Sequence, residues 1–144
     1  MARQPVGETS LQSLLSTLKV TLQPATFVFI TLPIPQGDMP LPIPFQDILM
    51  LFREAEGVTL IVPLPVAERL GLEHQYQCRM ITCDVHSSLE AVGFMATIAT
   101  KLAENGIPVN PVSGYYHDHL FVSVNEADRA VEILEEIREQ AAAQ

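Results

Sequence analysis

The stretch from Cys78 to Val124, CRMITCDVHSSLEAVGFMATIATKLAENGIPVNPVSGYYHDHLFVSV, decides the fold. Its first part, residues 78–86, is β-branched and apolar enough for a strand, with Ile81, Cys83 and Val85 on one face. Ser87 and Glu90 then have the S-x-x-E spacing that is typical of a helix start. Apolar residues recur at helical spacing through residues 91–104. The sequence therefore predicts a strand followed by an amphipathic helix.

The remainder of the stretch predicts a return to the sheet. Asn105-Gly106 supplies a left-handed residue that can end the helix. Residues 107–112 and 119–124 are typical strands, joined by a polar hairpin, and a last amphipathic helix follows from Asn125. This order of elements predicts an α+β, ferredoxin-like fold, with helices on one face of an antiparallel sheet.

The first half of the chain resembles the second in outline. It begins with a short helix at residues 11–18, followed by strands at 19–22 and 26–32. A proline-rich surface loop at residues 33–44 comes next, because proline excludes a helix interior or a central strand. A helix starting at Pro44 is then expected to bury a stripe of apolar side chains: Phe45, Ile48, Leu49 and Phe52.

A strand at residues 58–63 and a helix at 65–70 complete this half. Both halves thus contain strand, helix, glycine turn and strand. This shared order indicates an internal duplication, with one unit at residues 1–73 and the other at residues 74–144.

Composition narrows the class of function. The chain has 144 residues, 48% of them hydrophobic, and a net charge of −9, with only eight Lys and Arg. Nucleic acids and anionic membranes require a basic surface, so neither is expected as a partner. No apolar run has the length of a membrane helix or a signal peptide. Cys78 and Cys83 are neighbours on one predicted strand, which favours reduced thiols and a cytoplasmic protein.

Polar residues gather at one end of the predicted sheet, in the loop before helix 91–104 and in the hairpin. A helix N-terminus suits a carboxylate, and the carboxylates Glu90 and Asp118 suit an ammonium group. Ser87, Ser88 and Asn110 add neutral donors and acceptors. This combination predicts a site for a small amphoteric molecule. The alternative is structural: Ser87 and Glu90 cap the helix, and Gly93 makes room for packing.

Two further alternatives come from the same residues. His117 and His119 could bind a metal or act in acid–base catalysis, yet no third ligand and no nucleophile motif has a diagnostic spacing. We therefore expect no metal, no cofactor and no enzymatic activity. Tyr115 and Tyr116 could instead anchor a protein interface, which would make the chain an oligomerisation module without a ligand.

Several segments resemble the ACT domain, and more specifically the small bacterial proteins of unassigned function with two ACT-like units. The resemblance rests on residues 90–94, EAVGF, followed by Asn105-Gly106-Ile107, and on two longer strings, VHSSLEAVG at 85–93 and GYYHDHLFV at 114–122. It extends to FREAEGVTLIV at residues 52–62.

This resemblance implies two tandem βαββαβ units, paired sheets, a homodimer and regulatory binding of a small effector, most of all an amino acid. The regulated protein would be a separate chain. Val92 stands where ordinary ACT domains have proline, so we expect a different loop geometry. The implied ligand-binding residues are His86, Ser87, Ser88, Leu89, Glu90, Val92 and Gly93 in the loop, Asn110 opposite it, and Gly114, Tyr115, Tyr116, His117 and Asp118 as a lid.

Overall fold

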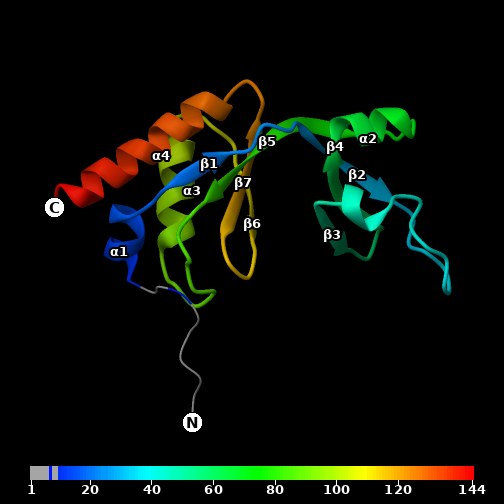
Figure 1. Ribbon diagram of the computed structural model, residues 1–144, viewed down its shortest axis with the longest axis horizontal. Helices are drawn as coiled ribbons and strands as arrows, with labels where there is room; N and C mark the ends of the chain where they lie inside the picture. Colours follow the sequence, from blue (N-terminus) through cyan, green and yellow to red (C-terminus); the bar gives the residue numbers. More distant parts are fainter. Residues whose placement is uncertain (1–6, 8–9) are drawn as a thin grey trace, which may run out of the picture. The chain divides into compact units, whose positions relative to one another are not determined.

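The computed structural model describes residue 7 and residues 10–144, which form two compact units (Figure 1). Unit 1 contains the described residues up to Pro24 together with Arg79–Gln144, and unit 2 contains Ala25–Cys78. Along the chain, unit 2 is thus inserted into unit 1. The two compact units have other bounds than the tandem units 1–73 and 74–144, which stay a prediction from the sequence.

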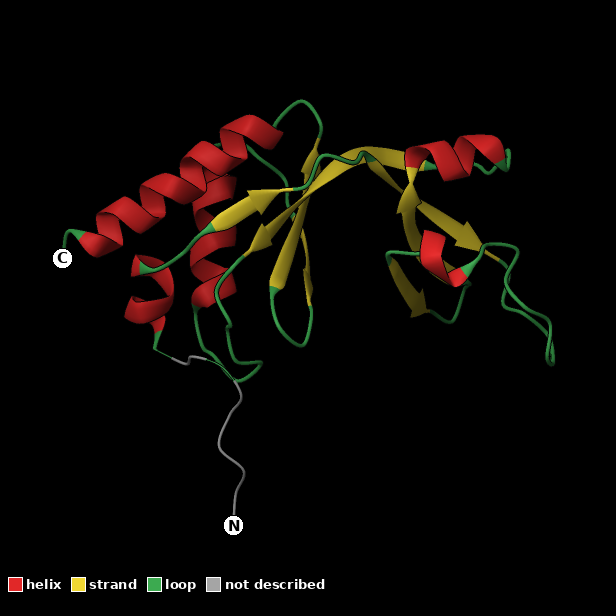
Figure 2. Ribbon diagram, in the orientation of Figure 1, coloured by secondary structure: helices red, strands yellow, loops and turns green. Residues whose placement is uncertain are grey.

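Unit 1 is a four-stranded sheet with three helices, which Figure 2 shows gathered on one side of the strands. Its order along the chain is strand, helix, strand, strand, helix, and the N-terminal segment adds a helix and an edge strand. The sheet order is β1 (Val20–Leu22), β5 (Gln75–Cys83), β7 (Asp118–Ser123) and β6 (Asn110–Ser113), and the helices are α1 (Leu11–Ser16), α3 (Phe94–Glu104) and α4 (Ala127–Ala142).

The edge strand β1 comes from the N-terminus and not from the end of the unit. It pairs antiparallel with β5, with Val20 opposite Cys83 and Leu22 opposite Ile81. The α-helix α1 is capped by a hydroxyl group, because the side chain of Ser10 accepts a hydrogen bond from the Ser13 amide. The N-terminal segment therefore completes the sheet that the second half of the sequence begins.

The core of unit 1 lies between this sheet and its helices. Ile81, Cys83 and Val85 are buried on the helix side, as the alternation in β5 predicts. The strand itself ends at Cys83, earlier than the expected residue 86. From the helices, the buried apolar residues are Leu14, Phe94, Ile98, Leu102, Ala130, Ile133, Leu134 and Ile137.

Unit 2 has the strand order β3 (Met50–Arg53), β4 (Val58–Pro63), β2 (Phe27–Leu32) and the first part of β5. The short helix α2 (Leu64–Arg69) covers one face. The alternate residues of β2 and β4 on that face are fully or almost fully buried, and they pack against Val66 and Ala67. As in unit 1, each paired residue of one strand faces the same side as its partner.

The prediction of a helix that starts at Pro44 is wrong. Only a 3₁₀ turn, η1 (Phe45–Asp47), is present, and the chain then becomes the edge strand β3. Phe45 is 88% exposed, so it does not belong to a buried stripe. Leu51 instead pairs with Leu60 in the sheet. Long-range strand pairing has overridden a helical spacing that was only local.

The α+β, ferredoxin-like fold class is confirmed. Both units contain antiparallel strand pairs. In unit 2 the hairpin strand β4 lies beside β2, and in unit 1 the hairpin strand β7 lies beside β5. The proline-rich segment 33–44 forms an irregular loop, as predicted. Within the part of the chain that the structure describes, no helix has the length and apolar character needed to cross a membrane.

Candidate functional site

The loop between β5 and α3 (residues 84–93, the β5–α3 loop) meets the turn between β6 and β7 (residues 114–117, the β6–β7 hairpin). His117 Nδ1 lies 3.3 Å from the Val85 carbonyl oxygen. The rings of His86 and Tyr116 are 5.7 Å apart between centroids, and Tyr115 contacts Tyr116 edge-on at 5.0 Å. The structure thus brings together the two segments in which the sequence places the site.

The predicted S-x-x-E cap is wrong, because α3 begins three residues later than expected. The Ser88 hydroxyl accepts a hydrogen bond from the Glu90 amide at 3.1 Å, and the Ser88 carbonyl accepts one from Ala91. These bonds close a turn inside the loop. The residue before α3 is Gly93, whose φ of 92° is left-handed and which offers no side chain for capping. A glycine with this φ is what lets the chain enter the helix from the turn.

The polar residues of the site divide into buried and exposed groups. Ser87, Ser88 and Asp118 are buried, and the Ser113 hydroxyl donates a hydrogen bond of 2.5 Å to Asp118 Oδ1. Glu90 is exposed, and its carboxylate has no hydrogen bond or ion pair among the residues that the structure describes. The buried groups therefore shape the loop and the hairpin, while Glu90 is available to solvent. The large apolar or aromatic side chains exposed here are Leu89, Val92, Tyr115 and Tyr116.

Two of the predicted residues have other surroundings than expected. Asn110 is opposite Phe121, at the far end of β6 from the hairpin, so it does not lie across from the β5–α3 loop. A Cβ atom at Gly93 would meet the Leu11 side chain of α1 at 3.4 Å. The close approach at Gly93 is thus made by the partly buried Leu11, which fits the alternative that Gly93 makes room for packing.

One residue near the site was missed by the sequence reasoning. Gly7 lies against the β5–α3 loop, since a Cβ atom there would be 2.6 Å from the His86 carbonyl oxygen and 2.9 Å from the Ser88 nitrogen. Its φ of 97° also favours glycine. Nothing in the local pattern of the N-terminal residues indicates this contact, because the two segments are distant in sequence.

The histidine pair of the hairpin is engaged with protein groups. His119 Nδ1 lies 3.0 Å from Thr82 Oγ1, and His117 Nδ1 contacts the Val85 carbonyl. Among the described residues there is no group of three or more His, Cys, Asp or Glu side chains that could hold a metal ion.

The two cysteines are free and buried, with thiols held in the protonated state. Burial raises the pKa of Cys78 to about 11. Burial, with smaller contributions from Asp118 and Asp84, raises the pKa of Cys83 to about 12. A protonated, buried thiol is a poor nucleophile and a poor metal ligand, so these cysteines act as core side chains.

His119 should make the stability of the protein depend on pH. Burial is the main cause that lowers its pKa, and His117 lowers it further, while Asp118 and Asp84 oppose the shift. Below the ordinary histidine value of about 6.5, the unfolded chain binds a proton that the folded imidazole does not yet accept. The free energy of unfolding should therefore fall as the pH drops below this value, and level off once the folded imidazole is protonated.

Urea unfolding between about pH 8 and about pH 5 measures this effect. His119→Gln should reduce the loss of stability on acidification relative to the unmodified chain, and His74→Gln in unit 2 is the control for removing an imidazole elsewhere. Equal pH slopes for the unmodified chain and His119→Gln would contradict the assignment.

Comparisons with known proteins agree with the fold. Two ACT domain family models match the chain, one over residues 6–79 and the other over residues 73–136. A protein of unknown function from Vibrio cholerae, named as a possible transport protein, is 38% identical over 90% of this chain and 97% of its own, with a TM-score of 0.75. No curated protein matches the sequence.

Two more distant structures share the fold. A protein from Agrobacterium tumefaciens is 15% identical, with a TM-score of 0.66 over 84% of this chain and 89% of its own. The regulatory subunit of aspartate kinase from Thermus flavus is 12% identical, with a TM-score of 0.57 over 82% of this chain and 95% of its own. The predicted resemblance is thus confirmed, and the chain belongs to the ACT domain family, with two ACT-like units.

Proposed function

We propose that this protein binds an amino acid at the β5–α3 loop and the β6–β7 hairpin, and that it regulates a separate protein as a homodimer. ACT domains are regulatory ligand-binding modules rather than catalytic ones. The proposal goes further in naming the ligand class, the site and the assembly. The observation that carries it is the contact of loop and hairpin through Val85 with His117 and through His86 with Tyr116.

The chemistry of the loop supports a zwitterionic ligand. The first amides of α3 have no partner within the helix, and the helix dipole adds a partial positive charge at this end, which together favour a carboxylate. Glu90 supplies an exposed carboxylate three residues before Gly93, which favours an ammonium group. Tyr115 and Tyr116 add exposed aromatic surface on the hairpin side, against which a ligand side chain could pack.

A thermal-shift screen of the twenty proteinogenic amino acids tests the proposal. A ligand that binds only the folded state stabilises it by about 2.7 kcal/mol at 100 times its dissociation constant. For a chain of this size, that raises the melting temperature by several degrees. A flat response to all twenty amino acids would overturn the proposal.

Glu90→Gln is the variant that assigns the site. It should remove the thermal shift, yet change the stability of the ligand-free protein by less than about 0.5 kcal/mol, because Glu90 is exposed. Glu135→Gln, on the exposed side of α4, is the matched control and should keep the full shift. If Glu90→Gln also keeps it, the ligand binds elsewhere.

A second candidate function is protein association without a small ligand. The exposed side chains of Leu89, Val92, Tyr115 and Tyr116 favour it, because apolar and aromatic patches mark interfaces. In that case light scattering should detect a dimer that Tyr116→Ser weakens, while the amino acid panel has no effect.

A further inference from the structure

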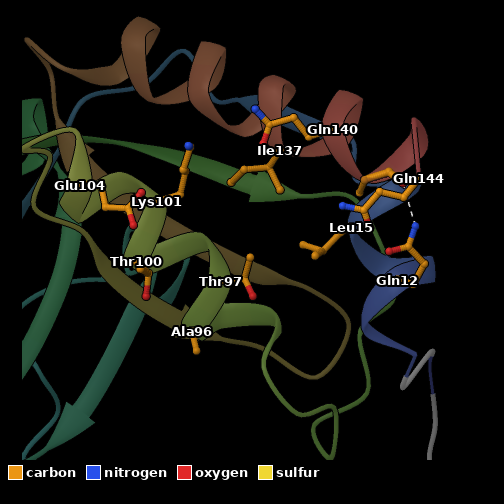
Figure 3. A pocket seen from close by; sticks show the side chains of 11 residues that line it. Gln12, Leu15, Ala96, Thr97, Thr100, Lys101, Glu104, Ile137, Gln140 and Gln144 are labelled. Atoms are coloured by element: carbon orange, nitrogen blue, oxygen red, sulfur yellow. Dashed lines mark hydrogen bonds between the residues drawn. The ribbon is translucent and has the colours of Figure 1, made fainter.

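A groove of about 490 Å³ lies among the three helices of unit 1 (Figure 3). We call it the helical groove. It is formed by residues from one face of α3, from the last turns of α4 and from α1. The residues that line it are Gln12, Leu15, Ala96, Thr97, Thr100, Lys101, Glu104, Ile137, Gln140, Ala141 and Gln144.

The two ends of the helical groove differ in chemistry. Lys101 and Glu104 lie at the C-terminal end of α3, which the bond from Arg129 to the Asn105 carbonyl places beside the start of α4. At the other end, Gln12 Nε2 donates a hydrogen bond of 2.8 Å to the Ala141 carbonyl at the close of α4. Figure 3 shows the charged pair at one end and the glutamines Gln12 and Gln144 at the other.

On the α4 and α1 side, the groove has apolar side chains between its two ends. Ile137 and Ala141 are buried members of the core, and Leu15 is partly buried against it. Figure 3 shows Leu15 and Ile137 between the charged end and the amide end. The remaining lining residues are mostly polar or charged, so apolar surface and polar groups lie side by side in the groove, as an amphoteric ligand with an apolar side chain would require.

The charged side chains of the groove, Lys101 and Glu104, have no partner among the described residues. Among the described residues, the ion pairs are Arg69 with Asp47 and Arg129 with Glu126, so neither Lys101 nor Glu104 takes part in one. The side chains of these two residues also make no hydrogen bond in that part of the chain. Lys101 and Glu104 are three residues apart on one helix, a spacing at which a pair could form. The groove therefore has one ammonium and one carboxylate on α3 that bind no other group of the described residues.

We propose that the helical groove is a second binding site, for an α-amino acid with an aliphatic side chain. The ligand carboxylate would bind Lys101, its ammonium group Glu104, and its side chain would lie along Ile137 and Leu15. A zwitterion suits this chain better than an anion, because the net charge of −9 repels anions but not a molecule without net charge. This site is distinct from the β5–α3 loop, and the proposal does not depend on binding there.

An NMR titration of the ¹⁵N-labelled full chain with L-leucine tests it. Saturable shifts are expected at Lys101, Glu104 and Ile137. Lys101→Met, which keeps an apolar stem, should weaken the binding about tenfold, as expected for losing one charge-assisted hydrogen bond. Lys19→Met is the matched control, since Lys19 is the other lysine of the chain, and it should leave the affinity unchanged.

The ligand can be varied in the same way. Isoamylamine lacks the carboxylate of leucine and 4-methylpentanoate lacks its ammonium group, and each should bind at least about tenfold more weakly. If L-leucine shifts no groove residue, or if Lys101→Met binds as the unmodified chain does, the groove site is refuted. Shifts confined to residues 84–93 would refute it too, while supporting the loop site, so the two proposals fail separately.

Discussion

Replacing Phe94 with alanine should lower the free energy of unfolding by about 3–5 kcal/mol. Phe94 is the first residue of α3, is only 2% exposed, and lies in the core of unit 1 with Ile98 and Leu102. Alanine would remove the ring and leave a cavity that the surrounding helices and sheet can only partly fill. Equilibrium unfolding in urea, followed by circular dichroism, measures the change.

Phe52→Ala is the matched control for this substitution. Phe52 lies in the edge strand β3 and is 62% exposed, so its truncation should cost less than about 1 kcal/mol. Similar losses for the two variants would contradict the assignment of Phe94 to the core. Because Phe94 directly follows the β5–α3 loop, its loss should also increase proteolysis within residues 84–93.

The strands and helices of unit 1 were predictable where one local pattern determined them. The alternation of Ile81, Cys83 and Val85 places three residues on the buried face, and the structure confirms it. The helix start was not predictable in the same way. The spacing of Ser87 and Glu90 fits a capping box, but a left-handed Gly93 requires a turn before the helix begins.

Unit 2 shows where local reasoning fails. The spacing of Phe45, Leu49 and Phe52 fits a helix, although the chain forms a 3₁₀ turn at Phe45 and then pairs with β4 as an edge strand over residues 50–53. An edge strand with apolar residues facing solvent has no distinctive pattern of its own, because its apolar and polar side chains need not alternate along the chain. The position of β1 was hidden for a related reason, since its partner β5 is more than 50 residues away in the sequence.

The two segments of the candidate site were predictable from the sequence, but the contacts between them were not. The clustering of polar residues at 86–93 and 113–119 correctly indicated two segments that meet. Which atoms meet depends on the register of β6 and β7, and this register places Asn110 opposite Phe121 and away from the hairpin. The contact of Gly7 with His86 depends on the path of the N-terminal segment, which no local pattern determines.

Leu60→Ala is expected to have the next largest effect, a loss of about 2–5 kcal/mol in the free energy of unfolding. Leu60 has no exposed surface, and it lies in the core of unit 2 with Val28, Val62 and Val66. Its direct partner in the sheet, Leu51, is 43% exposed and provides the matched control. Leu51→Ala should cost clearly less than Leu60→Ala, about 1 kcal/mol, since a large part of the Leu51 side chain stays in contact with water in the native fold.

The location of the loss is as informative as its size. The described residues form two separate hydrophobic clusters, one in each unit, and Leu60 belongs only to the cluster of unit 2. Native-state hydrogen exchange of Leu60→Ala should therefore show faster opening in β2 and β4, while amides of α3 and β7 keep more of their protection. Equal acceleration in all four elements would mean that the two clusters unfold as one cooperative unit, and the division of the chain into two cores would then have no energetic meaning.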